Sequence, residues 1–376
     1  MDKKNSVITI QKGLCCICVF LCHFWGVMHT IGNDLIDEIF WNDGPLEVFT
    51  SGNVAVCIFM VISAYLLGKK ARNNDYDIGK IVIKRYFRLT IPCGVIALFG
   101  VLFYKLGAFQ HYIIGQENNN VWLLGHYSNP IGWMTAIKEA LFGIILLGRT
   151  ETYPEFWMMK YMFWGTIVSI IVIELLKNVN SIIKIVGGVI LVVFWGRYID
   201  SYYCCFILGA LWALFEDESS IISKILASKF CALLWPVGWG IAALSMKYEG
   251  VRNVVIIRAV AAVLIVRGFM SLIEWMKCFF PKNRLTNGVY KCFIKLGEIS
   301  FGIYSVHILV MCSIFSWWWK FFEDGNPFVR CELNYIVSML ITIILAYLFH
   351  EFVEKKLFGT IWKTTSKLIY NKKKLS

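Results

Sequence analysis

The chain of 376 residues is 58% hydrophobic and only 16% charged, and it contains 15 Trp and 28 Phe. Water-soluble proteins average about 25% charged and 45–50% apolar residues. This composition therefore excludes a soluble globular enzyme and a disordered chain, and it indicates a protein that lies in a lipid bilayer. The net charge of +12 does not indicate nucleic-acid binding, because Lys and Arg cluster at the ends of apolar segments, where they set membrane topology.

The apolar segments predict an all-α fold, a polytopic transmembrane helical bundle. A span needs about 20 apolar residues to cross about 30 Å of hydrocarbon. Eight segments meet this requirement clearly, near residues 9–31, 46–68, 89–109, 156–176, 229–246, 251–275, 298–320 and 332–353. The region 181–216 adds two shorter segments, separated by Arg197 and Asp200. We predict about ten spans in a single transmembrane domain over residues 1–376.

Charge orients these spans. The segments 69–88 and 277–297 and the tail Lys372–Lys374 are basic, so they are predicted to be cytoplasmic, with both termini on that side. The acidic segment 32–47 is predicted to lie outside. A long outer loop is expected over about 110–155, and its part 131–148 is expected to be amphipathic or re-entrant.

The 13 cysteines are odd in number, and most lie inside apolar runs. They are expected to be buried thiols rather than disulfides. Cys15, Cys18 and Cys22 fall on a different helix face from His23, so no metal site is predicted.

Ionisable side chains at membrane depth are costly and mark a functional or a paired site. Lys12 and His23 are separated by ten residues in the first span, so they share one helix face about 16 Å apart along the axis. Such a pair could hold a long polyanionic donor at the cytoplasmic end and place a base at its reactive tip. Arg258, in a later span, is expected to support the site or to be satisfied by a neighbouring helix.

Two further constellations carry polar groups. Arg85 and Arg88 stand at i and i+3 where the third span begins, which suits bidentate capture of phosphate; anchoring at the cytoplasmic face is the alternative. Ser300, Tyr304 and His307 form a polar stripe on one helix face. The stripe predicts a lined cavity, and a structural hydrogen-bonded cluster is the alternative.

Taken in order, these segments resemble the acyltransferase-3 superfamily of integral membrane O-acyltransferases. The resemblance covers nearly the whole chain, with Lys standing at position 12 where Arg is usual and Ala at position 64 where Gly is usual. The matching residues are Lys12 and His23; Phe59, Ser63, Tyr65 and Leu66; Arg85, Arg88 and Pro92; Phe156 and Trp157; Ser300, Ile303, Tyr304 and His307; and Phe352, Glu354 and Lys355.

The resemblance implies an acyltransferase that takes an acyl group from cytoplasmic acyl-CoA, most often acetyl-CoA, and passes it to a hydroxyl of an extracytoplasmic carbohydrate. Within that family, the chain is most similar to the polysaccharide O-acetyltransferases of the bacterial cell membrane, which act on capsule, O-antigen or exopolysaccharide. Acetyl-CoA would be a donor substrate, and no bound cofactor, metal or nucleic acid is expected.

Carried onto this chain, the resemblance and the spacing give each residue an expected role. Lys12, Arg85, Arg88 and Ser63 would bind acyl-CoA, His23 would be the base on the sugar hydroxyl or the acylated nucleophile, and Tyr304 and His307 would assist it. Ser300, Glu354 and Arg258 would support the site, and Trp157 would stack on a sugar ring. The rival functions are a transporter or flippase of a sugar-linked or small anionic substrate and a non-catalytic sensor or assembly partner.

Overall fold

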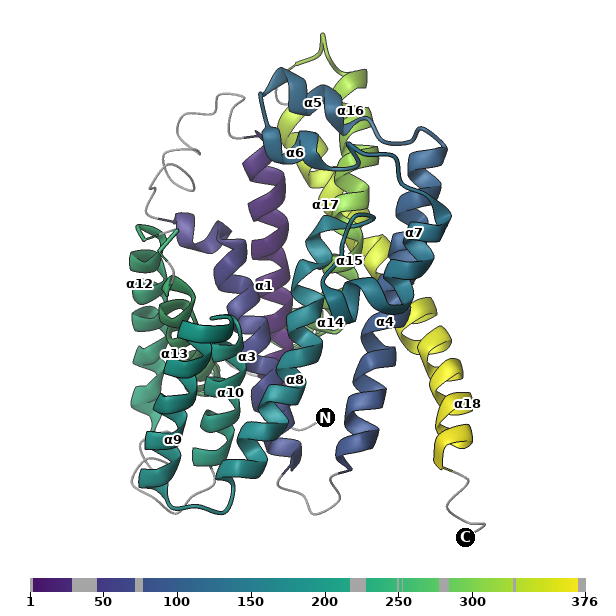
Figure 1. Cartoon of the computed structure of the whole chain (residues 1–376). Coiled ribbons are helices and arrows are strands. Elements are labelled where there is room, and N and C mark those ends of the chain that lie inside the picture. The colour runs from purple at the N-terminus through teal and green to yellow at the C-terminus, as the bar shows by residue number, and fades with distance from the viewer. Residues whose placement is uncertain are drawn as a thin grey trace. The chain divides into compact units, whose positions relative to one another are not determined.

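The computed structural model describes residues 3–28, 46–71, 77–216, 228–248, 250–251, 253–276, 284–326 and 329–370. These residues form helices, and no β-strand occurs among them (Figure 1). Long apolar segments adopt helices in hydrocarbon because a helix satisfies its backbone hydrogen bonds internally. The predicted all-α class is confirmed.

Eight helical segments of the described chain are long and apolar enough to cross a membrane. Their bounds are Ser6–Phe24, Gly52–Ala71, Ile78–Lys105, Pro154–Leu176, Ser181–Ile199, Val254–Met276, Ser300–Phe321 and Val329–Tyr370. Two shorter apolar helices, Tyr203–Phe215 and Phe230–Met246, coincide with the two remaining predicted spans. The chain is a multi-pass membrane protein, whereas the count of ten spans and the side of the termini stay predictions.

Both basic segments that were expected to be loops are helical over much of their length. The helix α4 (Ile78–Lys105) takes up the end of segment 69–88, and α14 (Arg284–Glu298) takes up the end of segment 277–297. Lys and Arg are good helix formers, so a helix can extend through a basic segment that hydropathy alone does not identify as helical. Residues 72–76 and 277–283, most of 32–47, and Lys372–Lys374 lie outside the described residues.

The predicted outer loop at 110–155 also contains short helices. They are α5 (His111–Glu117), α6 (Val121–Gly125), α7 (Trp133–Lys138), a π-helical segment (Glu139–Leu147) and a 3₁₀ turn (Pro154–Phe156). The segment 131–148 is thus helical over 133–147, and its re-entrant course stays a prediction. No disulfide joins the cysteines within the described residues, and most of these cysteines are buried.

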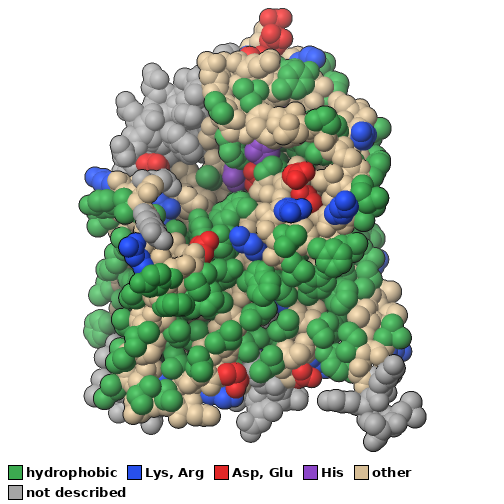
Figure 2. Space-filling model, in the orientation of Figure 1, with side chains coloured by type: hydrophobic (Ala, Val, Ile, Leu, Met, Phe, Trp, Pro, Cys, Tyr) green, Lys and Arg blue, Asp and Glu red, His purple; other side chains and the backbone are tan. Residues whose placement is uncertain are grey.

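Contacts divide the helices into two compact units, and the first comprises Met1–Cys22, Asp34–Ile78 and Trp164–Glu298. In it, α10 (Tyr203–Phe215) packs against α3 (Gly52–Ala71), α9 (Ser181–Phe194) and α13 (Val254–Met276), and α13 also packs against α12 (Leu234–Met246). The outer face of α9 exposes Ile182, Val186 and Val189, and Figure 2 shows hydrophobic side chains over that part of the surface. This apolar surface suits contact with lipid.

Helix α1 (Lys3–Met28) is held in this unit by a close approach to α14. A Cβ added at Gly297 would lie 1.8 Å from the carbonyl oxygen of Thr9. We therefore expect Gly297→Ala to force the two helices apart, at a cost of about 1–3 kcal/mol, and to lower the melting temperature measured in nanodiscs. Gly288→Ala in the same helix is the control, because nothing lies within 4 Å of a Cβ there; an equal loss of stability in both variants would contradict the expectation.

The second unit comprises His23–Asn33, Gly79–Phe163 and Ile299–Ser376. Here α15 (Ser300–Val310) packs against α17 (Asn334–Phe349), and α5 packs against α6 and α16 (Ser316–Phe321). The helix α8 (Trp157–Leu176) begins in this unit, and a π-helical segment (His350–Leu357) joins α17 to α18 (Phe358–Tyr370). The unit thereby gathers the end of α1, the segment 110–156 and α15.

Candidate functional site

His23 lies near the end of α1, half-buried, and its imidazole contacts two other rings of the second unit. The indole of Trp122, on α6, stacks on it with ring centroids 4.9 Å apart and ring planes inclined by 10°. The imidazole of His307, on α15, lies 5.2 Å away with the planes inclined by 30°. These contacts fix the orientation of the His23 ring, and the face of an indole stabilises a positive charge beside it.

His307 has one nitrogen committed to its own helix. Its Nδ1 lies 2.8 Å from the carbonyl oxygen of Tyr304, so Nδ1 carries the proton and Nε2 has a free lone pair in the neutral ring. The side chain is 1% exposed, and Nε2 has no hydrogen-bond partner within the described residues. The ring therefore presents a buried hydrogen-bond acceptor.

Tyr304 is tied to the scaffold through its hydroxyl, which donates to the backbone carbonyl of Glu155. One turn away on the same helix, the amide of Ile308 donates to the hydroxyl of Tyr153 over 3.3 Å. Together these bonds join α15 to the chain just before α8. The predicted stripe of Ser300, Tyr304 and His307 is buried on α15. The bonded hydroxyl of Tyr304 positions the helical turn that precedes His307.

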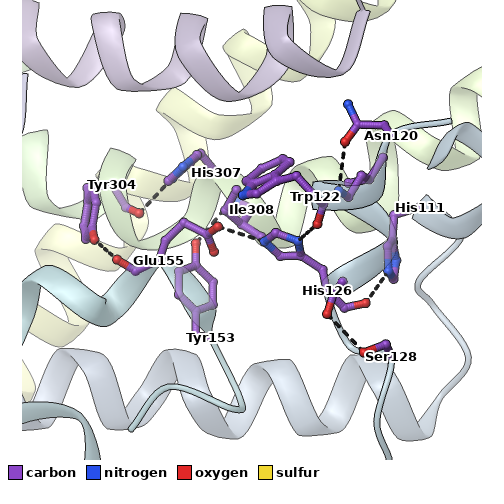
Figure 3. A network of polar contacts seen from close by, with 12 residues as sticks. His111, Asn120, Trp122, His126, Ser128, Tyr153, Glu155, Tyr304, His307 and Ile308 are labelled. Carbon is purple, nitrogen blue, oxygen red and sulfur yellow. Dashed lines mark hydrogen bonds and ion pairs between the residues drawn. The ribbon is translucent and has the colours of Figure 1, made fainter. Parts of the chain in front are cut away.

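A buried pair that the sequence did not predict adjoins this cluster. His126, which follows α6, places its Nε2 2.8 Å from the Oε1 of Glu155, and its Nδ1 lies 2.9 Å from the carbonyl oxygen of Trp122. Figure 3 shows the Glu155 side chain between Tyr153 and His126. Since both nitrogens of His126 face oxygen acceptors, both must carry protons, and Glu155 is then the matching carboxylate.

The electrostatics of His126 agree with this arrangement. Burial lowers its pKa, but the charge of Glu155, the hydrogen bond to that carboxylate and the hydrogen bond to the Trp122 carbonyl outweigh burial, so the pKa is raised above the usual value. Burial is also the main cause of the lowered pKa of His111, whose Nε2 donates to the carbonyl of His126 over 2.7 Å. A charged His126 beside a neutral His111 is the expected state.

We expect His126 to stay protonated above a pH of about 6.5, the usual histidine value, when its ring is followed by NMR in labelled protein. Because the folded-state pKa is raised, the stabilisation by the pair is complete below the unfolded-state pKa and is lost as the pH rises through the folded-state pKa. His126→Gln should remove this part of the pH dependence of the melting temperature. Titration of His126 at or below its usual value would contradict the assignment.

The short helix α6 is fastened at both ends, which keeps Trp122 on His23. The Oδ1 of Asn120 accepts from the amide of Leu123 over 2.9 Å and caps the helix, and its Nδ2 donates to the carbonyl of Gly26 on α1 over 3.0 Å. His126 closes the other end through the Trp122 carbonyl. A five-residue helix has little stability of its own, so these bonds position the indole.

The two predicted arginines lie elsewhere in the second unit, near the start of α4. The Nε and Nη2 of Arg85 each lie 3.4 Å from the carbonyl oxygen of Met162 on α8, and Arg88, one turn on, is exposed. Arg85 is thus directed towards α8 while Arg88 is open to a ligand.

Three predicted residues belong to the first unit. Lys12 lies on α1 and is half-buried, and Ser63 lies on α3 and is also half-buried. Arg258, on α13, is buried and donates from Nε to the Oγ of Ser245 on α12 over 3.2 Å. A neighbouring helix therefore supplies a partner for Arg258, as the structural alternative expected.

Two other predicted residues, Trp157 and Glu354, contact side chains of their own helices. The ring of Trp157 meets Tyr161 edge to face, with centroids 5.9 Å apart, and the tryptophan that stacks on His23 is Trp122. Glu354 pairs with the Nδ1 of His350 at 3.0 Å, one turn before it on the same helix, and not with the arginine pair. These two side chains meet because residues at i and i+4 are neighbours on the surface of a helix.

His23, Tyr304 and His307 are thus brought together as expected, and Trp122, His126 and Glu155 join them. The four-residue spacing of Trp122 and His126, and the carboxylate directly before Phe156 and Trp157, were available signals for these partners. No group of three His, Cys, Asp or Glu side chains in the described part of the chain could hold a metal ion. The cluster offers imidazole bases and hydrogen-bond acceptors, which suits proton abstraction from a hydroxyl.

Comparison with known proteins adds one finding. A family model described as an acyltransferase domain matches residues 7–351, which covers most of both units. No curated protein and no solved structure matches the chain.

Proposed function

This chain belongs to the acyltransferase-3 family, and from that membership we propose that it moves an acyl group, most simply acetyl, from cytoplasmic acyl-CoA to a hydroxyl of an extracytoplasmic carbohydrate. The acceptor class would be a capsular or other surface polysaccharide, and the site of action the bacterial cell membrane. The observation that supports this proposal most is the contact of His23 with Trp122 and His307, since it presents oriented imidazoles beside a buried acceptor atom.

In the proposed reaction His23 takes the proton of the sugar hydroxyl while the oxygen bonds to the thioester carbonyl carbon. The carbon–sulfur bond then breaks, and the thiolate of CoA takes the proton from the His23 imidazolium, which leaves neutral imidazole, free CoA and the ester. Trp122 stabilises the imidazolium through its π face. In a second version His23 is acylated first and passes the group to the hydroxyl.

The donor would be held by cations and the acceptor by aromatic side chains. Arg85 and Arg88 are proposed to bind the phosphates of CoA, because guanidinium groups form paired hydrogen bonds with phosphate oxygens. Lys12 is proposed to contribute a further positive charge to phosphate binding. Ser63 is proposed to contact the pantetheine arm. Trp157 is proposed to contact the carbohydrate. Tyr304 acts through position, since its hydroxyl is already bonded to the Glu155 carbonyl.

The experiment is acyl transfer by purified protein in nanodiscs, followed as release of CoA from acetyl-CoA with and without a panel of oligosaccharides. Release that increases with an oligosaccharide, together with an acetylated product in mass spectrometry, is the expected result. If folded protein neither binds nor turns over acetyl-CoA, the proposal fails, and counterflow transport of sugar-linked or anionic substrates becomes the measurement to make.

A further inference from the structure

Among the buried polar atoms of the second unit that have no hydrogen-bond partner within the described residues, two acceptors adjoin the His23 cluster. They are the Oε2 of Glu155 and the Nε2 of His307, on side chains that are 5% and 1% exposed. A buried polar atom without a partner is costly, and such atoms are rare in folded proteins. Their presence together indicates a ligand that supplies hydrogen-bond donors.

The neighbouring contacts determine that both atoms accept rather than donate. His126 uses the Nε2 proton on the Oε1 of Glu155 and the Nδ1 proton on the Trp122 carbonyl, which leaves the Oε2 of an ionised carboxylate free. The Nδ1 proton of His307 is used on the Tyr304 carbonyl, which leaves the Nε2 lone pair free. Neither atom can satisfy the other, because each lacks a proton.

Both atoms belong to one part of the site. The backbone of Glu155 is bonded to Tyr304, one turn before His307, and the ring of His307 lies within electrostatic reach of the Glu155 carboxylate, as does the ring of His23. On the more open side, His23 is half-buried and Trp122 is 40% exposed. A ligand can therefore approach past these two rings.

The two substrates of an acyl transfer differ in the hydrogen-bonding groups that they could present to these two acceptor atoms. The reacting end of an acyl thioester carries a carbonyl oxygen and a sulfur, which accept hydrogen bonds, whereas a carbohydrate carries several hydroxyl donors on adjacent carbons. We propose that Glu155 Oε2 and His307 Nε2 form the subsite for hydroxyl groups of a carbohydrate acceptor, with Glu155 in direct contact and His126 as its positioning residue. The identity of the ligand rests on the proposed acyl transfer.

This subsite assigns a role in ligand binding to the buried ion pair of His126 and Glu155. His126 holds Glu155 in one rotamer and balances its charge, so that the free oxygen can bind a hydroxyl. The bound hydroxyl then lies beside His23 and His307, where its neighbour on the sugar ring can lose a proton. Placing the acceptor in this way raises the rate through proximity and orientation.

The first test is oligosaccharide binding without acetyl-CoA, which does not depend on turnover. Saturation-transfer NMR would be recorded for the wild type and Glu155→Gln in nanodiscs, with neutral glucose- and N-acetylglucosamine-containing oligosaccharides and the same compounds permethylated. We expect the free sugars to bind the wild type, and the permethylated ones, which have no hydroxyl donors, not to bind. Glu155→Gln should weaken binding roughly 10- to 100-fold, the loss expected for a hydrogen bond to a charged group.

The second test is kinetic and separates binding from folding. Glu155→Gln should raise the KM for the oligosaccharide by a similar factor, while acetyl-CoA affinity and acceptor-free CoA release change less than twofold. His126→Gln keeps an N–H donor for Oε1 but no charge, and it should raise the same KM more than it lowers kcat. Glu151→Gln, an exposed carboxylate in the same segment, is the matched control and should leave all three quantities unchanged.

Three outcomes would overturn the subsite. The first is binding of no free oligosaccharide by the wild type, and the second is equal binding by Glu155→Gln, as expected if only a buried water bridges Oε2 to the unpartnered hydroxyl of Tyr127. The third is an equal loss of donor and acceptor affinity with a lower melting temperature, which indicates a structural role. Failure of the proposed function is distinct from these, since it shows as oligosaccharide binding without any CoA release.

Discussion

Replacement of His23 by alanine is expected to lower acyl transfer to the oligosaccharide by about 10²- to 10⁴-fold, the usual contribution of a general base. In the proposed reaction its imidazole, stacked on Trp122, is the group that takes the hydroxyl proton and returns it to the leaving thiolate. The measurement is kcat for CoA release at saturating acetyl-CoA and oligosaccharide. Acetyl-CoA affinity should change little, because the proposed phosphate contacts, Arg85, Arg88 and Lys12, do not include His23.

The control for this substitution is Cys18→Ala, which also truncates a half-buried side chain of α1 but leaves the stacked rings of His23, Trp122 and His307 intact. It should retain the wild-type rate, and both variants should elute as folded protein. If His23→Ala keeps more than about a tenth of the wild-type kcat, His23 is not the base, since a smaller loss falls below the general-base range. Accumulation of an acetylated peptide containing His23 would select the two-step version of the reaction.

Replacement of Arg85 by alanine is expected to raise the KM for acetyl-CoA by roughly 10- to 100-fold. A hydrogen bond to a charged group contributes about 1.5–3 kcal/mol, and about 1.4 kcal/mol corresponds to a factor of ten in affinity. Its Nε and Nη2 lie 3.4 Å from the carbonyl of Met162, a long contact that a phosphate can replace. The KM for the oligosaccharide should stay within twofold of the wild type.

Arg85→Lys and Lys105→Gln distinguish geometry from charge. Lysine keeps the charge but loses the planar fork, so Arg85→Lys should recover only part of the affinity. Lys105, exposed at the other end of α4, carries the same charge, and Lys105→Gln should leave the KM for acetyl-CoA unchanged. Equal effects of Arg85→Ala and Lys105→Gln would show a general effect of net charge and would contradict a phosphate site at Arg85.

The site was predictable where its residues share one helix. The spacing of Ser300, Tyr304 and His307 gave their common face on α15, because 3.6 residues make one turn whatever the helix contacts. The same rule predicted that Lys12 and His23 lie on one face of α1. The partners of these residues come from other elements, so the contacts of Trp122, His126 and Glu155 depend on how the segment 110–156 folds.

The contacts of Glu354 and Arg258 likewise could not be read from the sequence alone. Glu354 was expected to be an interfacial carboxylate or the partner of the arginine pair, and its side chain lies on His350. Arg258 was expected to support the site or to be satisfied by a neighbouring helix, and its Nε donates to Ser245 on α12. The ends of α4 and α14 were not predicted, because hydropathy identifies the residues that can lie in hydrocarbon. The backbone hydrogen bonds of a helix can continue beyond those residues.

The sequence by itself determined the class of this protein: apolar segments of membrane length must become helices, since hydrocarbon offers no other partner for the backbone, and the motif order predicted the acyltransferase-3 family that the family match confirms. Only the tertiary structure decided what surrounds each reactive group. The protonation of His126 and the free acceptor atoms of Glu155 and His307 depend on contacts between segments distant in the chain. Such contacts follow from packing, and no local spacing encodes them.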